Sequence, residues 1–319
     1  MTEGPASSDK TTSFLPRSTS DRTLHPNDFV IRPLEESEDL FGLMEIQYAV
    51  WGREEAVTSH QMIAALRNGG IIIGAHLEDQ LVGFSYGFPG YKEGRAYLCS
   101  HMLAVLPELR NAGLGWHLKL AQREAALQKG YSLITWTYDP LQAPNARLNL
   151  GKLRALTRSY VPDYYGKMLD QINQNLASDR FVVEWHLKSQ RVVNALSAYS
   201  QERAAGAVSP LDKKLVPSRE EKVGSLPLWG QAPKVNEIDL SSGRITSSPP
   251  NLVLTAPQVI VTIPGDFQAL KQADLKQAKH WREITRQIFP HYFRRGYAAV
   301  DFSGDRESGC YLLERKELL

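Results

Sequence analysis

The segment "VLPELRNAGLG", residues 105–115, is the feature that most constrains how this chain folds. The apolar run 97–105 predicts a strand that stops at a proline, and the residues after Gly115 have the spacing of a helix. An arginine and two glycines therefore lie between the end of a strand and the first turn of a helix. Because a helix N-terminus presents unpaired N–H groups and the positive end of its dipole, the segment predicts a site for a phosphorylated ligand.

The composition indicates a globular chain without a bias toward a polyanionic partner. Its 319 residues suffice for one large domain or two modest ones, and 42% hydrophobic residues can form a substantial core. Lysine and arginine number 37 against 35 aspartates and glutamates, so we expect no binding to nucleic acid or to a membrane surface. No apolar stretch approaches the roughly 20 residues that span a bilayer.

The cysteines and the N-terminal segment favour a reduced, cytoplasmic location. Cys99 and Cys310 cannot build a disulfide framework, and no cysteine pair has the spacing of a metal site, so we expect no metal. Residues 1–26 are rich in serine and threonine and have no apolar signal core. We interpret them as a disordered tail, with an organelle transit peptide as the alternative.

Apolar periodicity predicts an alternation of strands and helices over the first half of the chain. We expect a strand at 29–34, helices at 40–50 and 60–67, a hairpin over 71–88, a strand at 97–105, a helix at 114–129, a strand at 132–138 and helical residues at 145–155. In the strand at 97–105, strict alternation places Tyr97, Cys99, His101, Leu103 and Val105 on one face, with Leu98, Ser100, Met102 and Ala104 on the other.

The second half is less regular. We expect a strand at 181–187, a helix at 192–199, then a strand, a helix and two strands at 259–263, 281–288, 297–302 and 310–314. These predictions divide the chain into a main domain at 27–175, a strand and helix at 176–205, a Pro-rich linker or excursion at 206–250 and an α+β extension at 251–319. The extension could continue the main sheet, form a half-domain or make a dimer contact; its apolar strand favours burial in a mixed sheet.

Three kinds of phosphate-binding loop place glycines before a helix, and the segment 105–115 can be compared with each of them. A P-loop requires Lys and Ser or Thr after its last glycine, whereas Trp116 follows Gly115 here. A dinucleotide fingerprint requires a glycine where this chain has Arg110, and it follows a parallel strand rather than a hairpin. The third kind is the pyrophosphate loop of coenzyme A acyltransferases, whose pattern Gln/Arg-x-x-Gly-x-Gly/Ala is met by Arg110, Gly113 and Gly115.

On these residues and on the order of its elements, the segment 29–170 resembles the GNAT acyltransferase superfamily. The further stretches "ITWTYDPLQAPNARLNLGKL", "FVVEWHL" and "GCYLLER" resemble a poorly characterised branch with its own C-terminal extension. The resemblance implies an α+β fold: a mixed, mostly antiparallel, splayed sheet flanked by helices. It also implies acetyl-CoA or another acyl-CoA as co-substrate, and direct attack by the amine of a small, for example amino-acid-like, acceptor.

The resemblance further implies which residues hold coenzyme A. The backbone of the strand end pairs with the pantetheine arm, the loop binds the diphosphate and an asparagine amide touches the arm. The corresponding residues are Met102, Leu103, Val105, Arg110, Asn111, Ala112, Gly113, Leu114, Gly115, Trp116 and Asn145.

The catalytic groups are harder to assign, because Leu150 occupies the position at which the family has a tyrosine as general acid. Tyr160, Tyr164 and Tyr165 follow downstream and are candidate acids, and His101 is the candidate base, with a structural histidine as the alternative. The remaining candidates each have a purely structural role as the alternative. Asn149 could position the substrate, Cys99 could provide a covalent route, and Asp139 and Glu184 could bind an ammonium group. Trp136 and Trp185 could line the acceptor pocket, and the basic segment 291–297 could bind a carboxylate.

Three functions remain open from the sequence. The first is an N-acyltransferase acting on a small amine. The second is an inactive coenzyme A-binding sensor or scaffold, which Leu150 motivates. The third is an N-acetyltransferase acting on a protein or peptide, with the Pro-rich segment as a partner-binding arm. A homodimer is compatible with each of them.

Overall fold

The computed structural model describes residues 28–40, 42–110, 113–166, 176–204, 231–239 and 245–315, the side chains of the helix at 190–204 only as far as 197. The predicted tail 1–26, the loop residues Asn111 and Ala112, and most of the predicted linker lie outside the described residues.

The first half of the chain forms the elements that the periodicity predicts. In chain order they are β1 (Phe29–Pro33), α1 (Leu43–Trp51), α2 (Ser59–Arg67), β2 (Ile71–Leu77), β3 (Gln80–Lys92), β4 (Arg95–Val105), α3 (Leu114–Gln128) and β5 (Leu133–Tyr138). Strands β1 to β4 pair antiparallel in sequence order, so that α3 is the first connection that crosses to a parallel neighbour.

The second half adds strands on the far side of β5. Its elements are α4 (Ala143–Ala146), the π-helical turn η5 (Arg147–Lys152), β6 (Leu156–Val161), β7 (Arg180–His186), α5 (Gln190–Ala204), β8 (Ile238–Asp239), β9 (Thr246–Ser247), β10 (Gln258–Pro264), α7 (Phe267–Ala273), α8 (Leu275–Arg294), β11 (Tyr297–Gly304) and β12 (Ser308–Arg315). Strand β6 was not predicted, because its sequence "LTRSYV" shows neither clear alternation nor an apolar run.

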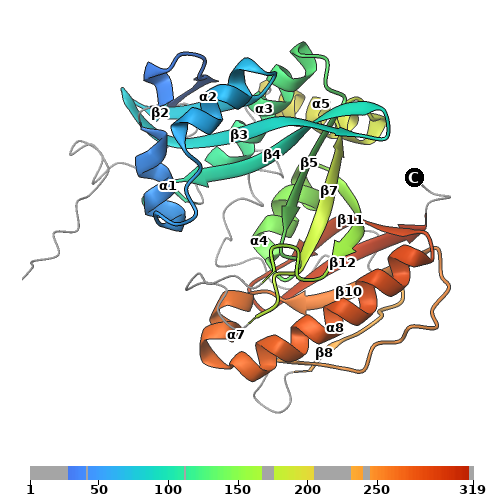
Figure 1. Cartoon of the computed structure of the whole chain (residues 1–319). Helices are drawn as coiled ribbons and strands as arrows, with labels where there is room; N and C mark the ends of the chain where they lie inside the picture. The colour runs from blue at the N-terminus through green and yellow to red at the C-terminus, as the bar shows by residue number, and fades with distance from the viewer. Residues whose placement is uncertain are drawn as a thin grey trace, which may run out of the picture.

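Among the described residues the strands form a ten-stranded sheet in the order β1-β2-β3-β4-β5-β7-β6-β11-β12-β10, with β8 and β9 pairing separately. Every pairing in the large sheet is antiparallel except that of β4 with β5. The fold is therefore α+β with a mostly antiparallel sheet, as predicted. In Figure 1, β5 and β7 connect an upper part, which carries α1 to α3, to a lower part, which carries α7 and α8.

Helices α1 and α3 cover opposite faces of the N-terminal strands. The ring of Trp51, in α1, meets Phe84 edge-on at 6.4 Å, and Phe84 lies opposite Ala104 in the β3–β4 register. Leu103, the residue before Ala104 in β4, contacts α3. A Cβ atom placed on Gly115, in the first turn of α3, would lie 3.7 Å from the Cδ2 atom of Leu103. Because neighbouring residues of a strand point to opposite faces, the two helices enclose the sheet between them.

Strands β4 and β5 part from each other after a short paired region. Their register consists of two pairs, Leu98 with Ile134 and Cys99 with Thr135. From Ser100 and Trp136 onward no pairing joins the two strands in the described part of the chain. We call the point where the pairing ends the fork. The predicted splayed sheet is thus present, and the gap opens toward the end of β4 that leads into α3.

A β-bulge in β4 corrects one prediction. Tyr86 pairs with Met102 but Gly87 pairs with Ser100, so His101 is an extra residue. Ser100 and Leu103 both contact α3, whereas the His101 ring lies against Tyr86 and Phe88 at 6.1 and 5.6 Å. The prediction that Leu103 shares a face with His101 was wrong, because strict alternation assumes a strand without an extra residue.

The C-terminal extension continues the main sheet. A single register pair, Ala299 with Thr157, joins β11 to β6, and α8 packs across this part of the sheet through Phe289, which meets Phe181 at 4.6 Å (Figure 1). Strand β10 is buried as predicted, although it is the last strand of the sheet. Its outer edge bonds to the segment 233–236, where the Val235 N–H donates to the Ile260 carbonyl at 2.7 Å.

Buried ion pairs fasten α8 to the loops that follow β5 and β6. Arg282 donates to both carboxylate oxygens of Asp139, at 2.8 and 2.5 Å, and their side chains are 4% and 13% exposed. Arg286 donates to both oxygens of the fully buried Asp179, whose Oδ2 atom also accepts from the Tyr160 hydroxyl at 2.5 Å. These contacts hold the extension in one position against the strands that border the fork.

We predict that Arg282→Ala lowers the free energy of unfolding by about 3–5 kcal/mol, because it leaves the Asp139 carboxylate buried without its partner. Urea denaturation measures this loss. The control is Lys92→Ala, which removes an exposed ion pair with Glu93 and should change stability by less than about 1 kcal/mol. Equal effects of the two substitutions would contradict the prediction.

Candidate functional site

The first turn of α3 lies beside the open end of the gap between β4 and β5. Gly113 is the N-cap residue and has a left-handed backbone with φ of 81°, a conformation that glycine adopts without strain. Its carbonyl accepts from the Trp116 N–H at 3.0 Å and from the His117 N–H at 3.4 Å. The N–H groups of Leu114 and Gly115 come before these two bonds in the first turn of the helix, where N–H groups have no intrahelical acceptor and can bind an anion.

Gly115 is not required by packing within the chain. Its φ lies outside the left-handed region, and a Cβ placed on it would meet one atom within 4 Å, Cδ2 of Leu103 at 3.7 Å. The space beside this backbone is therefore open, which suits a ligand that approaches the main chain closely. Arg110 is exposed next to this turn. Asn111 and Ala112, which were predicted to take part, lie outside the described residues.

The predicted pantetheine-binding strand has one edge available. Residues 100–105 of β4 pair with β3 but have no register partner on β5 among the described residues. Met102 is buried, while Leu103 and Val105 are half-buried. Asn145 is exposed in the short helix α4, which begins after the turn that follows β5. The described residues predicted to hold coenzyme A thus lie at the end of β4, at the start of α3 and in α4.

The open face of the sheet beside the fork carries polar and aromatic side chains. The registers place Cys99, Thr135 and Glu184 side by side on β4, β5 and β7. The Tyr165 hydroxyl lies 3.1 Å from Thr137 Oγ1, and the exposed rings of Tyr164 and Tyr165 meet at 4.8 Å. This face combines a carboxylate with aromatic rings, a suitable surface for an amine.

The titration behaviour of this face favours a neutral base. Partial burial against Tyr86 and Phe88 lowers the pKa of His101, which keeps its imidazole neutral at neutral pH. Burial raises the pKa of the Cys99 thiol, although Lys119 acts in the opposite direction. A raised pKa disfavours the nucleophilic thiolate and so argues against the covalent route.

Sequence reasoning missed a buried lysine directly under the fork. Lys119, on α3, is 2% exposed; its Nζ atom donates to Ser100 Oγ at 2.8 Å and to Gln122 Oε1 at 3.2 Å. The same atom lies 3.8 Å from the centre of the Trp136 ring. Leu118, Gln122 and Ala126 mark the buried stripe of α3, and a lysine at the edge of such a stripe is ordinarily exposed.

The family comparison matches the part of the chain that holds the fork. Residues 37–148 match the model of the acetyltransferase (GNAT) family. These residues form a GNAT-family domain. The match ends before β6, so the strands that extend the sheet and the helices α5, α7 and α8 lie beyond it. No curated protein matches the chain significantly.

Solved structures of low sequence identity are similar to this chain, among them GNAT family acetyltransferases from Elizabethkingia anophelis and Streptococcus pneumoniae. One from Elizabethkingia anophelis with acetyl-CoA bound is 14% identical, with 50% of this chain and 99% of that chain covered and a TM-score of 0.40. Arabidopsis thaliana Naa50 with the bisubstrate analogue CoA-Ac-MVNAL is 16% identical, with 49% and 97% covered and a TM-score of 0.39. One from Streptococcus pneumoniae is 16% identical, with the same coverage and a TM-score of 0.40.

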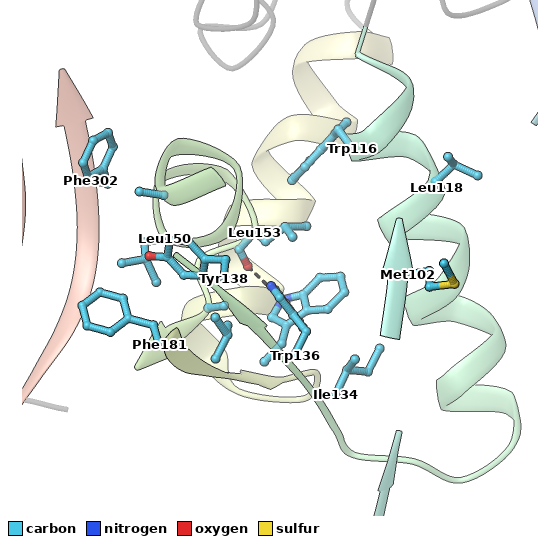
Figure 2. Packing of buried hydrophobic residues seen from close by; sticks show 14 of the residues in the cluster. Met102, Trp116, Leu118, Ile134, Trp136, Tyr138, Leu150, Leu153, Phe181 and Phe302 are labelled. Atoms are coloured by element: carbon cyan, nitrogen blue, oxygen red, sulfur yellow. Dashed lines mark hydrogen bonds between the residues drawn. The ribbon is translucent and has the colours of Figure 1, made fainter. Parts of the chain in front are cut away.

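The structure places the candidate general acids in different surroundings. Leu150 is completely buried and belongs to the hydrophobic core drawn in Figure 2. Tyr160 is committed to the buried Asp179, and burial raises its pKa far above the usual value. Tyr164 and Tyr165 lie at the open face, where partial burial, then the charges of Tyr165, Cys99 and Tyr97, raise the pKa of Tyr164. Tyr160 is thus buried and bonded within the core, whereas Tyr164 and Tyr165 are exposed on the open face.

The structural alternatives hold for most of the remaining residues. Trp136 and Trp185 pack edge-on at 6.0 Å, and the Trp185 N–H donates to the Leu153 carbonyl at 2.8 Å. Asp139 forms its turn and binds Arg282. Two more are engaged within the protein: Asn149 is buried in η5, and His291 bonds to the Leu252 carbonyl at the end of α8. Glu184 pairs with His186 and Arg158, but its side chain remains 26% exposed on the open face.

Across the described ranges no helix combines the length and the apolar character needed to cross a bilayer. In the same part of the chain no three His, Cys, Asp or Glu side chains come together as potential metal ligands.

The buried lysine makes stability depend on pH in a specific direction. Burial lowers the pKa of Lys119 to about 7, whereas the amine titrates near 10.5 when exposed. Between these values the unfolded chain binds more protons, so stability rises with pH through this window. We predict that Lys119→Met stabilises the protein most at or below pH 7 and that this advantage shrinks toward pH 10. Urea denaturation of both proteins at pH 6 and pH 9 measures it; a difference independent of pH would contradict the assignment.

Proposed function

We propose that this protein is an acyl-CoA-dependent N-acyltransferase, with acetyl-CoA as its simplest donor and a small amine as its acceptor. The observation that carries the proposal is the juxtaposition of three features: a helix that begins at a glycine, a strand edge with which no described strand pairs, and a polar aromatic face at the fork. Acyl transfer from coenzyme A needs a place for a diphosphate, for an extended amide-containing arm and for a nucleophile.

The turn at 113–116 is suited to the diphosphate. Two main-chain N–H groups, the dipole of the fifteen-residue helix α3 and the nearby Arg110 favour anionic oxygen atoms. The open space beside Gly115 allows those atoms to reach the backbone. The residues present therefore fit the group.

The edge of β4 at 100–105 is suited to the pantetheine arm. Because no described strand pairs with this edge, its N–H and C=O groups can bond to the two amides of the arm as they would to a neighbouring strand. Coenzyme A supplies an activated acyl group as a thioester. A backbone N–H of the β4 edge can polarise the thioester carbonyl, and pairing of the arm with the edge orients the acyl group at the fork.

The acceptor side is the open face with Cys99, Glu184 and Tyr165. We propose that His101 accepts the proton that the attacking amine gives up, because its ring is exposed at the bulge and its lowered pKa keeps it neutral. The anionic Glu184 and the rings of Tyr164 and Tyr165 position the amine. A small acceptor and a peptide terminus both have the required amine.

Release of free thiol from acetyl-, propionyl- and succinyl-CoA, followed with a panel of small amines and short peptides, tests the function. Amine-dependent release supports an acyltransferase, and its ranking across the panel separates small-molecule from peptide acceptors. Binding of coenzyme A without release from any donor would instead support the inactive binding module, which the buried Leu150 favours.

We predict that Gly115→Leu weakens coenzyme A binding at least tenfold, because the larger side chain fills the space that the diphosphate approaches. Isothermal titration measures the affinity. Gly115→Ala is the matched control and should stay within about threefold, since a methyl group contacts only Leu103. Thermal melts of both variants confirm folding; unchanged affinity in a folded Gly115→Leu protein would contradict the diphosphate site.

A further inference from the structure

Lys119 closes the fork from the α3 side. The paired part of β4 and β5 ends at Cys99 and Thr135, and Ser100 and Trp136 are the next residues on the two strands. The Lys119 amine contacts both of them, through a hydrogen bond of 2.8 Å and a cation–π contact of 3.8 Å. A ligand that extends along the gap between the strands must end at this amine, because strand pairing closes the gap there.

The buried groups around the Lys119 amine offer more hydrogen-bond donors than acceptors. No ion pair joins Lys119 to a carboxylate in the described part of the chain, although the side chain is almost completely buried. Gln122 receives hydrogen bonds at Oε1 from Ser100 and Lys119, while its buried Nε2 atom has no partner among the described residues. A buried cation and an unused amide donor at one place are costly unless an electron-rich group comes to them.

The proposed reaction produces such a group. When the acyl group moves to an amine, sulfur leaves with an electron pair and needs a proton. Leu150 cannot supply one, and the Tyr160 hydroxyl is held by Asp179. Tyr164 and Tyr165 lie on the open face, on the side of the acceptor rather than of α3.

We propose that Lys119 is the proton donor to the departing sulfur; the proposal rests on the proposed function. The acceptor nitrogen bonds to the acyl carbon, the carbon–sulfur bond breaks and its electron pair remains on sulfur. The Lys119 ammonium gives its proton to that sulfur and becomes a neutral amine. The proton of the attacking amine passes to His101. After the products leave, His101 releases that proton to the solvent and Lys119 takes one up from the solvent, so that both groups return to their starting charge.

The environment of Lys119 suits both of its charge states. Burial lowers its pKa to about 7, so both the ammonium and the amine are present near neutrality. Ser100 and Gln122 accept hydrogen bonds from it, and the Trp136 ring stabilises the cation. Among the described titratable groups, Cys99 is the one that raises the pKa of Lys119 electrostatically, and burial raises the pKa of the Cys99 thiol itself.

The test compares Lys119→Met, Lys119→Arg and the control Lys129→Met, which removes an exposed lysine at the end of the same helix. We expect Lys119→Met to remain folded, because an apolar side chain of similar length replaces a buried charge. Its kcat should fall at least 100-fold while its affinity for coenzyme A stays within threefold. Lys119→Arg should not restore kcat, because a guanidinium keeps its proton.

A binding experiment without turnover gives an independent readout. Coenzyme A is titrated into the wild-type and Lys119→Met proteins, and the ultraviolet absorbance of its thiolate is followed against pH. Next to an ammonium group the bound thiol should ionise at lower pH in the wild type than in Lys119→Met. The same thiolate profile in both proteins, or a kcat within threefold of wild type in folded Lys119→Met, would overturn the proposal.

The outcomes for the two proposals are distinguishable. If the wild-type protein does not bind coenzyme A, the proposed function fails and the role of Lys119 fails with it. If the wild type binds coenzyme A and transfers acyl groups while Lys119→Met does so equally well, the proposed function stands and only the proton donor is wrong.

Discussion

The parting of β4 from β5 is the constraint on which the candidate site depends. Two register pairs hold the strands together, and the bulge at His101 turns the β4 backbone just beyond them. The same bulge brings Ser100 and Leu103 onto α3, so the helix that offers its N-terminus to a diphosphate also closes the fork with Lys119. A change in this strand separation would therefore affect the anion site, the arm site and the buried amine together.

The extension beyond the GNAT match supports the other arm of the fork. Strand β7 pairs along the whole of β5, and β6 links it to β11 and the rest of the extension. The bidentate pair of Arg282 with Asp139 fixes the turn directly after β5, and the contacts of Asp179 fix the end of the loop that carries Tyr164 and Tyr165. The extension thus contributes to the site by positioning, in addition to completing the core.

Local patterns predicted the elements around the loop at 110–115, because strand alternation, a proline stop and two glycines act over a few residues. They could not predict β6 or the extra residue at His101, which depend on pairing with distant strands. Lys119 was missed for a related reason. A lysine at the edge of a helix stripe is usually solvated, and only the strands that part above α3 make this position buried.

A crystal structure of the protein with bound coenzyme A tests the central claim most directly. We predict diphosphate oxygen atoms within hydrogen-bond distance of the main-chain N–H groups of Leu114 and Gly115, with the arm along 100–105 of β4 and the sulfur next to Lys119. A diphosphate bound elsewhere, or an arm that does not enter the gap between β4 and β5, would contradict it.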